Sequence, residues 1–183
     1  MPRWESDAQG RLERAALELF ESQGFDRTSV AQIAGAAGLK ERSFYRYFPD
    51  KREVLFAGDE VEAHLVAQVE AADPGLTPLE ALLAAVGAAE EIFRPREFLL
   101  RRGRVIAANP ALAERELIKL ASIADALAPA VERRGVEPGE ARFIIDVVLA
   151  IHRRAMPRWL AEADTTLSQL IALAAAELRE AVM

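Results

Sequence analysis

The chain has 183 residues, of which 51% are hydrophobic and 28% charged, and its formal net charge at pH 7 is −6. This length suits one large or two small domains, and this composition is typical of a globular protein. The chain has no cysteine and two histidines, which excludes disulfides, thiolate metal sites and a histidine-rich metal centre. The sequence has no apolar run of about 18 residues and no secretory signal, so we expect a cytoplasmic protein without a membrane span. We also expect no cofactor.

Charge is distributed unevenly along the chain. Residues 1–52 carry a net charge of +1, whereas residues 53–183 carry −7. The short segment 40–52 alone carries +3. A small basic segment in an otherwise acidic protein indicates a local contact with a polyanion.

Apolar residues recur at helical spacing through the whole chain, and glycine and proline fall between these periodic stretches. Thr28 or Ser29 can cap the second helix, and Asp50 can cap the fourth. We predict an all-α fold with about nine helices and no strand. The expected helices cover residues 8–22, 29–36, 40–47, 51–72, 78–93, 95–108, 110–134, 138–156 and 164–182.

The second and third of these helices are short and are joined by a turn at Gly38, which predicts a helix-turn-helix. Ile33 and Leu39 can fill the small core between them, and alanines allow the two helices to approach closely. The second helix of such a motif presents polar residues to the major groove of DNA. The polar residues at its start are Lys40, Glu41, Arg42 and Ser43.

The span 9–55 resembles the DNA-binding half of the TetR family of bacterial repressors. The matching residues are Phe20, Gly24, Thr28, Ile33, Ala34, Ala37, Gly38, the run FYRYF at 44–48, Lys51 and Leu55. The resemblance implies a nine-helix fold, a homodimer and a C-terminal half that binds a small effector. It therefore implies a DNA-binding domain over 1–50 and an effector-binding and dimerisation domain over 51–183.

The resemblance also assigns roles within the DNA-binding half. Thr28 and Lys51 match positions that contact phosphates, and Tyr45 and Arg46 match the backbone- and base-contacting end of the recognition helix. The base-facing start of that helix corresponds to Lys40, Glu41, Arg42 and Ser43. The family often has a small hydroxyl residue where this chain has Lys40 and glycine where it has Arg42, so the operator sequence of a relative does not carry over.

Other interpretations of these residues stay open. Arg42 can read guanine in bidentate fashion, but it and Lys40 can also be surface charges. Glu41 can accept a hydrogen bond from cytosine or be a solvated acid. Tyr47 and Phe48 are interpreted as packing residues of the small domain.

Two C-terminal segments have broad apolar faces. Residues 138–156 carry Phe143 and Val147 among others, and residues 164–182 carry Leu170 and Leu178. Two such faces from each of two chains can form a four-helix bundle, which is the dimer interface implied by the family. The alternative is that both faces belong to the core of one chain.

The segments 99–116 and 151–160 resemble a TetR subgroup whose regulatory half is described as an acyl-CoA-like ligand-binding domain. A long, thin ligand needs an apolar tunnel and a cationic mouth. We expect these from Phe93, Phe98, Arg101, Arg102, Ile123, Leu127 and Trp159. The alternatives are core packing for the apolar residues and solvated or paired charges for the arginines.

We therefore expect a bacterial, nucleoid-associated repressor that a small hydrophobic effector, such as a fatty acyl-CoA, releases from a palindromic operator. The alternatives are an activator of the same family that senses another ligand class, and a helical module that binds a small molecule or a partner protein. An enzyme is not expected, because neither histidine lies in a Glu-x-x-His motif and no P-loop or serine hydrolase signature occurs.

Overall fold

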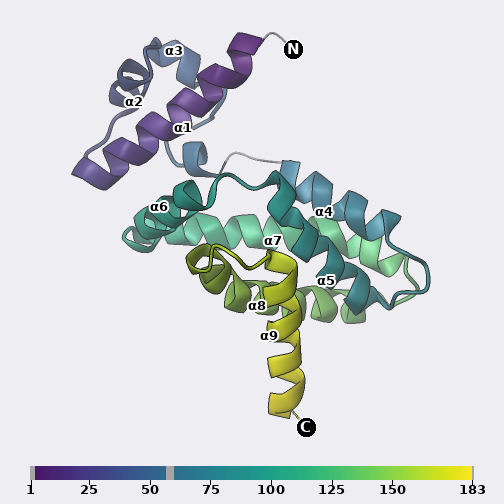
Figure 1. The fold of residues 1–183 in the computed structure, drawn as a ribbon. Coiled ribbons are helices and arrows are strands. Elements are labelled where there is room, and N and C mark those ends of the chain that lie inside the picture. Colours follow the sequence, from purple (N-terminus) through teal and green to yellow (C-terminus); the bar gives the residue numbers. More distant parts are fainter. Residues whose placement is uncertain (1–2, 57–59, 183) are drawn as a thin grey trace. The chain divides into compact units, whose positions relative to one another are not determined.

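The computed structural model describes residues 3–56 and 60–182, and within these ranges the chain folds into nine α-helices, two short 3₁₀ helices and no strand (Figure 1). This confirms the predicted all-α fold. Across the same residues, no helix has the length and apolar character needed to cross a membrane. The α-helices are α1 Arg3–Gln23, α2 Val30–Ala36, α3 Glu41–Phe44, α4 Glu60–Ala71, α5 Pro78–Ala88, α6 Arg96–Ala107, α7 Pro110–Glu132, α8 Pro138–Ala161 and α9 Leu167–Val182. The 3₁₀ helices are η1 Glu53–Leu55 and η2 Ala89–Ile92.

The described residues pack into two compact units. The first unit contains residues within 1–57 together with 97–118, and the second contains residues within 58–96 together with 119–183. The first unit therefore joins the predicted DNA-binding domain with the corner between α6 and α7. The predicted domain boundary at residue 50 stays a prediction.

The core of the first unit explains why the α6–α7 corner belongs to it. Phe44 and Phe48 are almost completely buried, and their rings lie 5.2 Å apart. The same apolar cluster includes Val105 and Ile106 of α6 and Leu112 of α7. Burial of side chains this large is the main stabilising contribution to a small helical unit.

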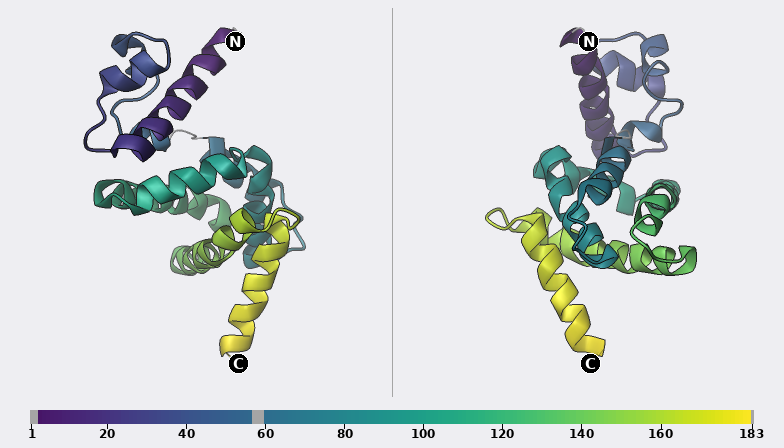
Figure 2. Two further views of the ribbon diagram at one scale, coloured as in Figure 1. Left: turned by 60° about the vertical axis from the view of Figure 1, so that its left-hand side comes forward. Right: turned by 90° about the vertical axis from the view of Figure 1, so that its right-hand side faces the viewer.

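In the second unit α5 packs against α8 and α9, and α8 packs against α9 (Figure 2). Two side chains join the start of α9 to this group: Glu90 accepts a hydrogen bond from the Leu167 backbone N–H, and Arg96 donates to the Thr165 carbonyl oxygen at 2.7 Å. The C-terminal end of α9, drawn in yellow, extends beyond the other helices of its unit in all three views (Figures 1 and 2). Its last turns are accordingly exposed.

The prediction of one helix over 51–72 is wrong for residues 51–56, which form turns and η1. Asp50 does cap this segment, because its carboxylate accepts hydrogen bonds from the backbone N–H groups of Arg52 (2.7 Å) and Glu53 (3.3 Å). Tertiary contacts then override helix propensity, since Val54 and Leu55 are buried in the core of the first unit. Residues 57–59, which the predicted helix also covered, lie outside the described residues.

Two smaller predictions about helix ends also need correction. The third helix ends at Phe44 rather than at residue 47, and residues 45–47 form a turn. The helix expected to stop at residue 156 continues through Pro157 to Ala161. The buried Trp159 explains this extension, because its packing in the last turns offsets the missing backbone N–H of proline. Of the two predicted caps of α2, the structure uses Ser29.

Candidate nucleic-acid interface

The helix-turn-helix is held by local hydrogen bonds at both ends of α2. The Gln32 backbone N–H donates to Ser29 Oγ at 3.1 Å, and the Gln32 side chain accepts from the Ser29 backbone N–H at 2.8 Å, which completes a capping box. At the other end Gly38 has φ +68°, a conformation that glycine adopts without steric cost. The Leu39 N–H then donates to the Ala34 carbonyl oxygen at 2.8 Å, and this turn sets the direction of α3.

The polar residues of α3 lie on the side opposite its buried anchors. Lys40, Glu41 and Arg42 are exposed, whereas Phe44 is completely buried. Tyr45 is 54% exposed although it is aromatic. An exposed row of basic and aromatic residues above a buried phenylalanine is suited to contact bases and phosphates.

Of the remaining recognition-helix candidates, one is half-buried and the other contacts a neighbouring side chain. Ser43 is half-buried. Arg46 is exposed, and its guanidinium both donates to the Tyr47 hydroxyl and lies 4.8 Å from the centre of the Tyr47 ring. Tyr47 is itself half-buried against the core, and Phe48 is buried in it. The packing interpretation of Tyr47 and Phe48 is therefore confirmed.

The two predicted phosphate contacts, Thr28 and Lys51, point into the loop between α1 and α2. Thr28 is 1% exposed, and its hydroxyl donates to the Gly24 carbonyl oxygen at 2.8 Å. Lys51 Nζ donates to the carbonyl oxygens of Phe25 at 2.7 Å and Thr28 at 2.8 Å. It also lies 4.1 Å from the centre of the Phe25 ring. Burial lowers the pKa of Lys51, and the charge of nearby Asp26 partly opposes that shift.

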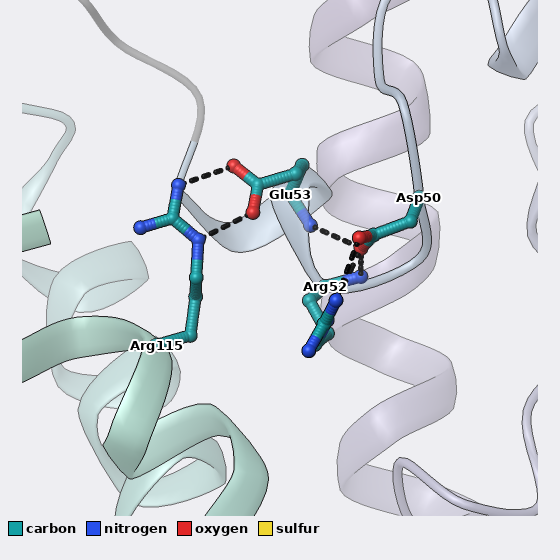
Figure 3. A network of polar contacts seen from close by, with 4 residues as sticks. All are labelled: Asp50, Arg52, Glu53 and Arg115. Carbon is teal, nitrogen blue, oxygen red and sulfur yellow. Dashed lines mark hydrogen bonds and ion pairs between the residues drawn. The ribbon is translucent and has the colours of Figure 1, made fainter. Parts of the chain in front are cut away.

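A polar network ties the segment after α3 to α7 (Figure 3). Arg115 holds the Glu53 carboxylate with two hydrogen bonds, of which the one from Nη2 to Oε2 measures 2.7 Å. On the other side of the segment Arg52 donates to the Asp50 carboxylate at 3.0 Å, and this bond is the main reason why the pKa of Asp50 is lowered. Sequence reasoning missed the Glu53–Arg115 pair, because two residues so far apart in the chain give no local signal.

Three residues predicted to contact the effector lie in the first unit. Arg101 donates to the Glu21 carboxylate at 2.9 Å. Arg102 donates to the Leu55 carbonyl oxygen at 2.6 Å and pairs with Glu116 at 3.0 Å. Phe98 packs against the core of that unit. These contacts give both arginines structural partners, and desolvation lowers the pKa of Arg102.

The other four predicted effector residues lie in the second unit. Ile123, Leu127 and Trp159 are buried, and the half-buried Phe93 meets the Trp159 ring edge-on at a centroid distance of 5.8 Å. Arg96, which sequence reasoning missed, lies 4.4 Å from the centre of the Trp159 ring. The indole N–H of Trp159 finds no hydrogen-bond partner among the described residues. An unsatisfied donor in an apolar core is a group that a bound ligand can satisfy.

Two histidines also lie in the second unit. His64 Nε2 is buried without a hydrogen-bond partner in the described part of the chain. Desolvation lowers the pKa of His152 to about 4, so its ring is neutral at pH 7. Residues 3–56 and 60–182 contain no group of three or more side chains that could hold a metal ion.

A helix-turn-helix with an exposed polar face, followed by a separate helical unit, is the architecture of a DNA-binding regulator. Residues 13–57 match the family model described as bacterial regulatory proteins, tetR family, and residues 76–183 match the model of the MftR C-terminal domain. The chain belongs to the TetR family of transcriptional regulators.

Relatives and solved structures agree with this assignment. The chain is 31% identical over 172 residues to the HTH-type transcriptional regulator TcmR of Streptomyces glaucescens, which covers 87% of this chain and 76% of TcmR. The TetR-family repressor FadR of Thermus thermophilus was solved in complex with lauroyl-CoA. Its structure matches this chain with a TM-score of 0.57 and 26% sequence identity, and the match covers 96% of this chain and 95% of FadR. PfmR, a TetR-family regulator also from Thermus thermophilus, matches this chain with a TM-score of 0.52 and 25% sequence identity. The match covers 92% of this chain and 97% of PfmR. These proteins are transcriptional regulators, not enzymes.

Proposed function

We propose that this regulator is a homodimeric repressor that a small, mostly apolar effector releases from a palindromic operator. The observation that carries the proposal is the exposed start of α3, where Lys40, Glu41 and Arg42 stand above the buried Phe44. The similarity to FadR, a repressor solved with lauroyl-CoA, supports both the sign of regulation and the class of effector. A protein with this function works at the chromosome, so we expect it at the bacterial nucleoid.

In the proposed complex α3 enters the major groove. Arg42 donates two hydrogen bonds to guanine, and Glu41 accepts one from cytosine. Ser43 and Arg46 lie beside them on the reading surface, while Lys40 and Tyr45 contact phosphates. Because two such helices must reach successive major grooves about 34–36 Å apart, the operator has two inverted half-sites.

The proposed dimer forms through α8 and α9. Both helices keep large apolar side chains exposed in the single chain: Phe143 is 68% exposed and Leu173 is 42% exposed. Leu178 and Val182 on the projecting end of α9 are exposed as well. Exposed apolar surface on two adjacent helices is typical of an interface between subunits.

The proposed effector site lies in the second unit and is lined by Phe93, Ile123, Leu127 and Trp159. We leave Phe98, Arg101 and Arg102 out of the proposed lining, because each makes contacts within the first unit. Effector binding shifts the equilibrium toward a state that does not fit the operator, and it does so by its higher affinity for that state.

The test titrates the protein, bound to a duplex that it has selected from a random pool, with lauroyl-CoA and with free coenzyme A as the control. We expect lauroyl-CoA to release the duplex and coenzyme A to leave it bound. We expect Trp159→Phe, which keeps the ring but removes the indole N–H, to raise the concentration needed for release. Retention of the duplex at saturating lauroyl-CoA would contradict the acyl-CoA assignment.

A second candidate, a helical module that binds a partner without reading DNA, predicts a different result. A folded dimer of that kind binds no duplex at low salt, where phosphate contacts are strongest. The exposed basic residues of α3 favour the repressor over this module.

A further inference from the structure

We propose that Lys51 is a positioning residue: its ammonium group holds the loop between α1 and α2 in place, rather than binding a DNA phosphate. This inference rests on the DNA-binding function of the chain, because the loop leads directly into α2 of the helix-turn-helix. It differs from the role that resemblance to the TetR family assigns to the same lysine.

The ammonium group is already engaged in the free protein. Two of its N–H bonds are donated to the Phe25 and Thr28 carbonyl oxygens, at 2.7 and 2.8 Å. The cation also faces the Phe25 ring at 4.1 Å, a separation at which the attraction between a cation and an aromatic ring is favourable. Two of the three N–H donors of this ammonium, together with its aromatic contact, are therefore already used within the loop before DNA binds.

Part of the loop is open to solvent, although Phe25 packs against the core and Thr28 is buried. Gly24 ends α1 with φ +87°, and a pocket of about 460 Å³ that is open to solvent borders the loop along residues 23–27. Asp26 and Arg27 are exposed. The long-range hydrogen bonds from Lys51 therefore complement the local bond from the Thr28 hydroxyl to Gly24.

Lys51 is itself held from both sides. Asp50 accepts hydrogen bonds from the backbone N–H groups of Arg52 and Glu53, and Arg115 of α7 grips the Glu53 carboxylate (Figure 3). The backbone on either side of Lys51 is thus anchored. Because its backbone and its two carbonyl acceptors are held in place, the Lys51 side chain links the segment 50–53 to the loop.

The consequence for DNA binding follows from the position of Ser29, which is next to Thr28 and caps α2. If the Lys51 hydrogen bonds are lost, the loop and the first turn of α2 gain conformational freedom. This freedom must be given up again when the motif binds DNA. Affinity for DNA then falls because the motif is less pre-organised, while the number of phosphate contacts is unchanged. A direct phosphate ligand would behave differently, because its removal lowers the salt dependence of binding by about 0.9 for each lost contact.

The first test uses the unaltered protein and exploits the fact that the sequence has three lysines, Lys40, Lys51 and Lys119. The chain is reductively methylated alone and with an arbitrary 30-base-pair duplex at low salt, and the rate at each lysine is read by mass spectrometry. We expect Lys51 to react slowly in both samples, and the exposed Lys40 to react quickly alone and slowly with DNA. Equal rates for Lys51 and Lys40 in the free protein, with DNA protecting both, would overturn the proposal.

The second test compares Lys51→Met with Lys40→Met, a matched change at the exposed start of α3. Dissociation constants for the same duplex are measured between about 50 and 200 mM salt, and amide hydrogen exchange is measured on the free proteins. We expect Lys40→Met to lower the salt slope, and Lys51→Met to keep the slope while speeding exchange at residues 25–29. A lowered slope in Lys51→Met with unchanged exchange would show that the lysine binds phosphate itself.

Discussion

Within the proposed interface, Arg42 is the residue that we expect to contribute most to sequence specificity, because it can distinguish guanine from other bases through two parallel hydrogen bonds. Its position at the exposed start of α3 follows from two buried anchors, Phe44 and Phe48, that fix the rotation of the helix. Extending a long side chain from this position requires more space between helix and groove than a glycine would. The operator must therefore be determined for this chain directly.

We predict that Arg42→Ala weakens binding to the selected duplex by about 1–3 kcal/mol, which is about 5- to 150-fold. Fluorescence anisotropy with a labelled duplex measures this change. Arg94→Ala, which removes an exposed arginine between η2 and α6, is the control and should bind like the unaltered chain. Equal affinities for both variants would show that Arg42 does not read a base.

We predict that His152 makes stability depend on pH in mildly acidic solution. Desolvation lowers its pKa from 6.5 to about 4, so between these values the unfolded chain binds a proton that the folded chain does not. The free energy of unfolding must therefore fall as pH falls through this window, by about 2 kcal/mol between pH 7 and pH 5. Urea unfolding at the two pH values measures it.

The variant His152→Asn serves as the reference, since it cannot titrate there. Its free energy of unfolding should change much less between pH 7 and pH 5. The lowered carboxylate pKa values of Asp50 and Glu80 affect stability only at lower pH, so they do not obscure the comparison. Identical pH dependence in both proteins would rule out His152 as the cause.

At the scale of the elements, the close contact between α5 and α9 depends on a glycine. A Cβ atom added at Gly87 would meet Ser168 Oγ at 2.6 Å and Ser168 Cα at 3.0 Å. The side chain can rotate, but the backbone atom can move only if the two helices separate. Both helices contribute buried residues to the core of the second unit, so separation costs packing energy.

We predict that Gly87→Ala destabilises the protein by about 1–3 kcal/mol. The matched change Gly103→Ala in α6 meets no atom within 4 Å, and it should be neutral or stabilise by up to about 1 kcal/mol through helix propensity. Thermal unfolding of both variants measures the difference. A destabilisation of equal size at both positions would contradict this explanation of the contact.

The elements that the sequence predicts well are those whose signals are local. Gly24, Ser29 and Gly38 mark the ends of α1 and α2, because each performs its function within a few residues of itself. The segment 51–56 could not be predicted in the same way. Its conformation depends on Arg115, which lies on another helix, so helix propensity alone gave the wrong result.

In the candidate site, too, features with a local signal could be predicted from the sequence, and features that depend on distant residues could not. The exposure of Lys40, Glu41 and Arg42 follows from the period of α3 and was predictable. The partners of Lys51 and Arg102 were not, since both side chains bend toward backbone carbonyl oxygens that no sequence pattern marks. Long basic side chains have several positions within reach, and only tertiary structure selects one.

For the whole molecule, the proposed dimer and the palindrome depend on each other. A two-fold axis through α8 and α9 presents two α3 helices with inverted orientation, and inverted half-sites are the DNA sequence that matches such symmetry. Phe143 and Leu173 are exposed in the single chain and are the side chains that a partner would bury.

We predict that the unaltered chain sediments as a dimer at micromolar concentration and that Phe143→Asp combined with Leu173→Asp sediments as a monomer. Each subunit would then bring two unpaired carboxylates into an apolar interface, and burying such charges is strongly unfavourable. Leu100→Asp, an equally polar change at an exposed leucine of α6, should leave the dimer intact. Analytical ultracentrifugation distinguishes these results, and a double variant that stays dimeric would place the interface elsewhere.

The measurement that tests the central claim most directly is selection of bound DNA from a random duplex pool by the full chain. A repressor that reads DNA with two α3 helices enriches one sequence with two inverted half-sites, whose centres are separated by about one turn of DNA or a multiple of it. Recovery of such a palindrome is the result that we predict. A folded dimer that enriches no sequence, or one without inverted symmetry, would contradict the account.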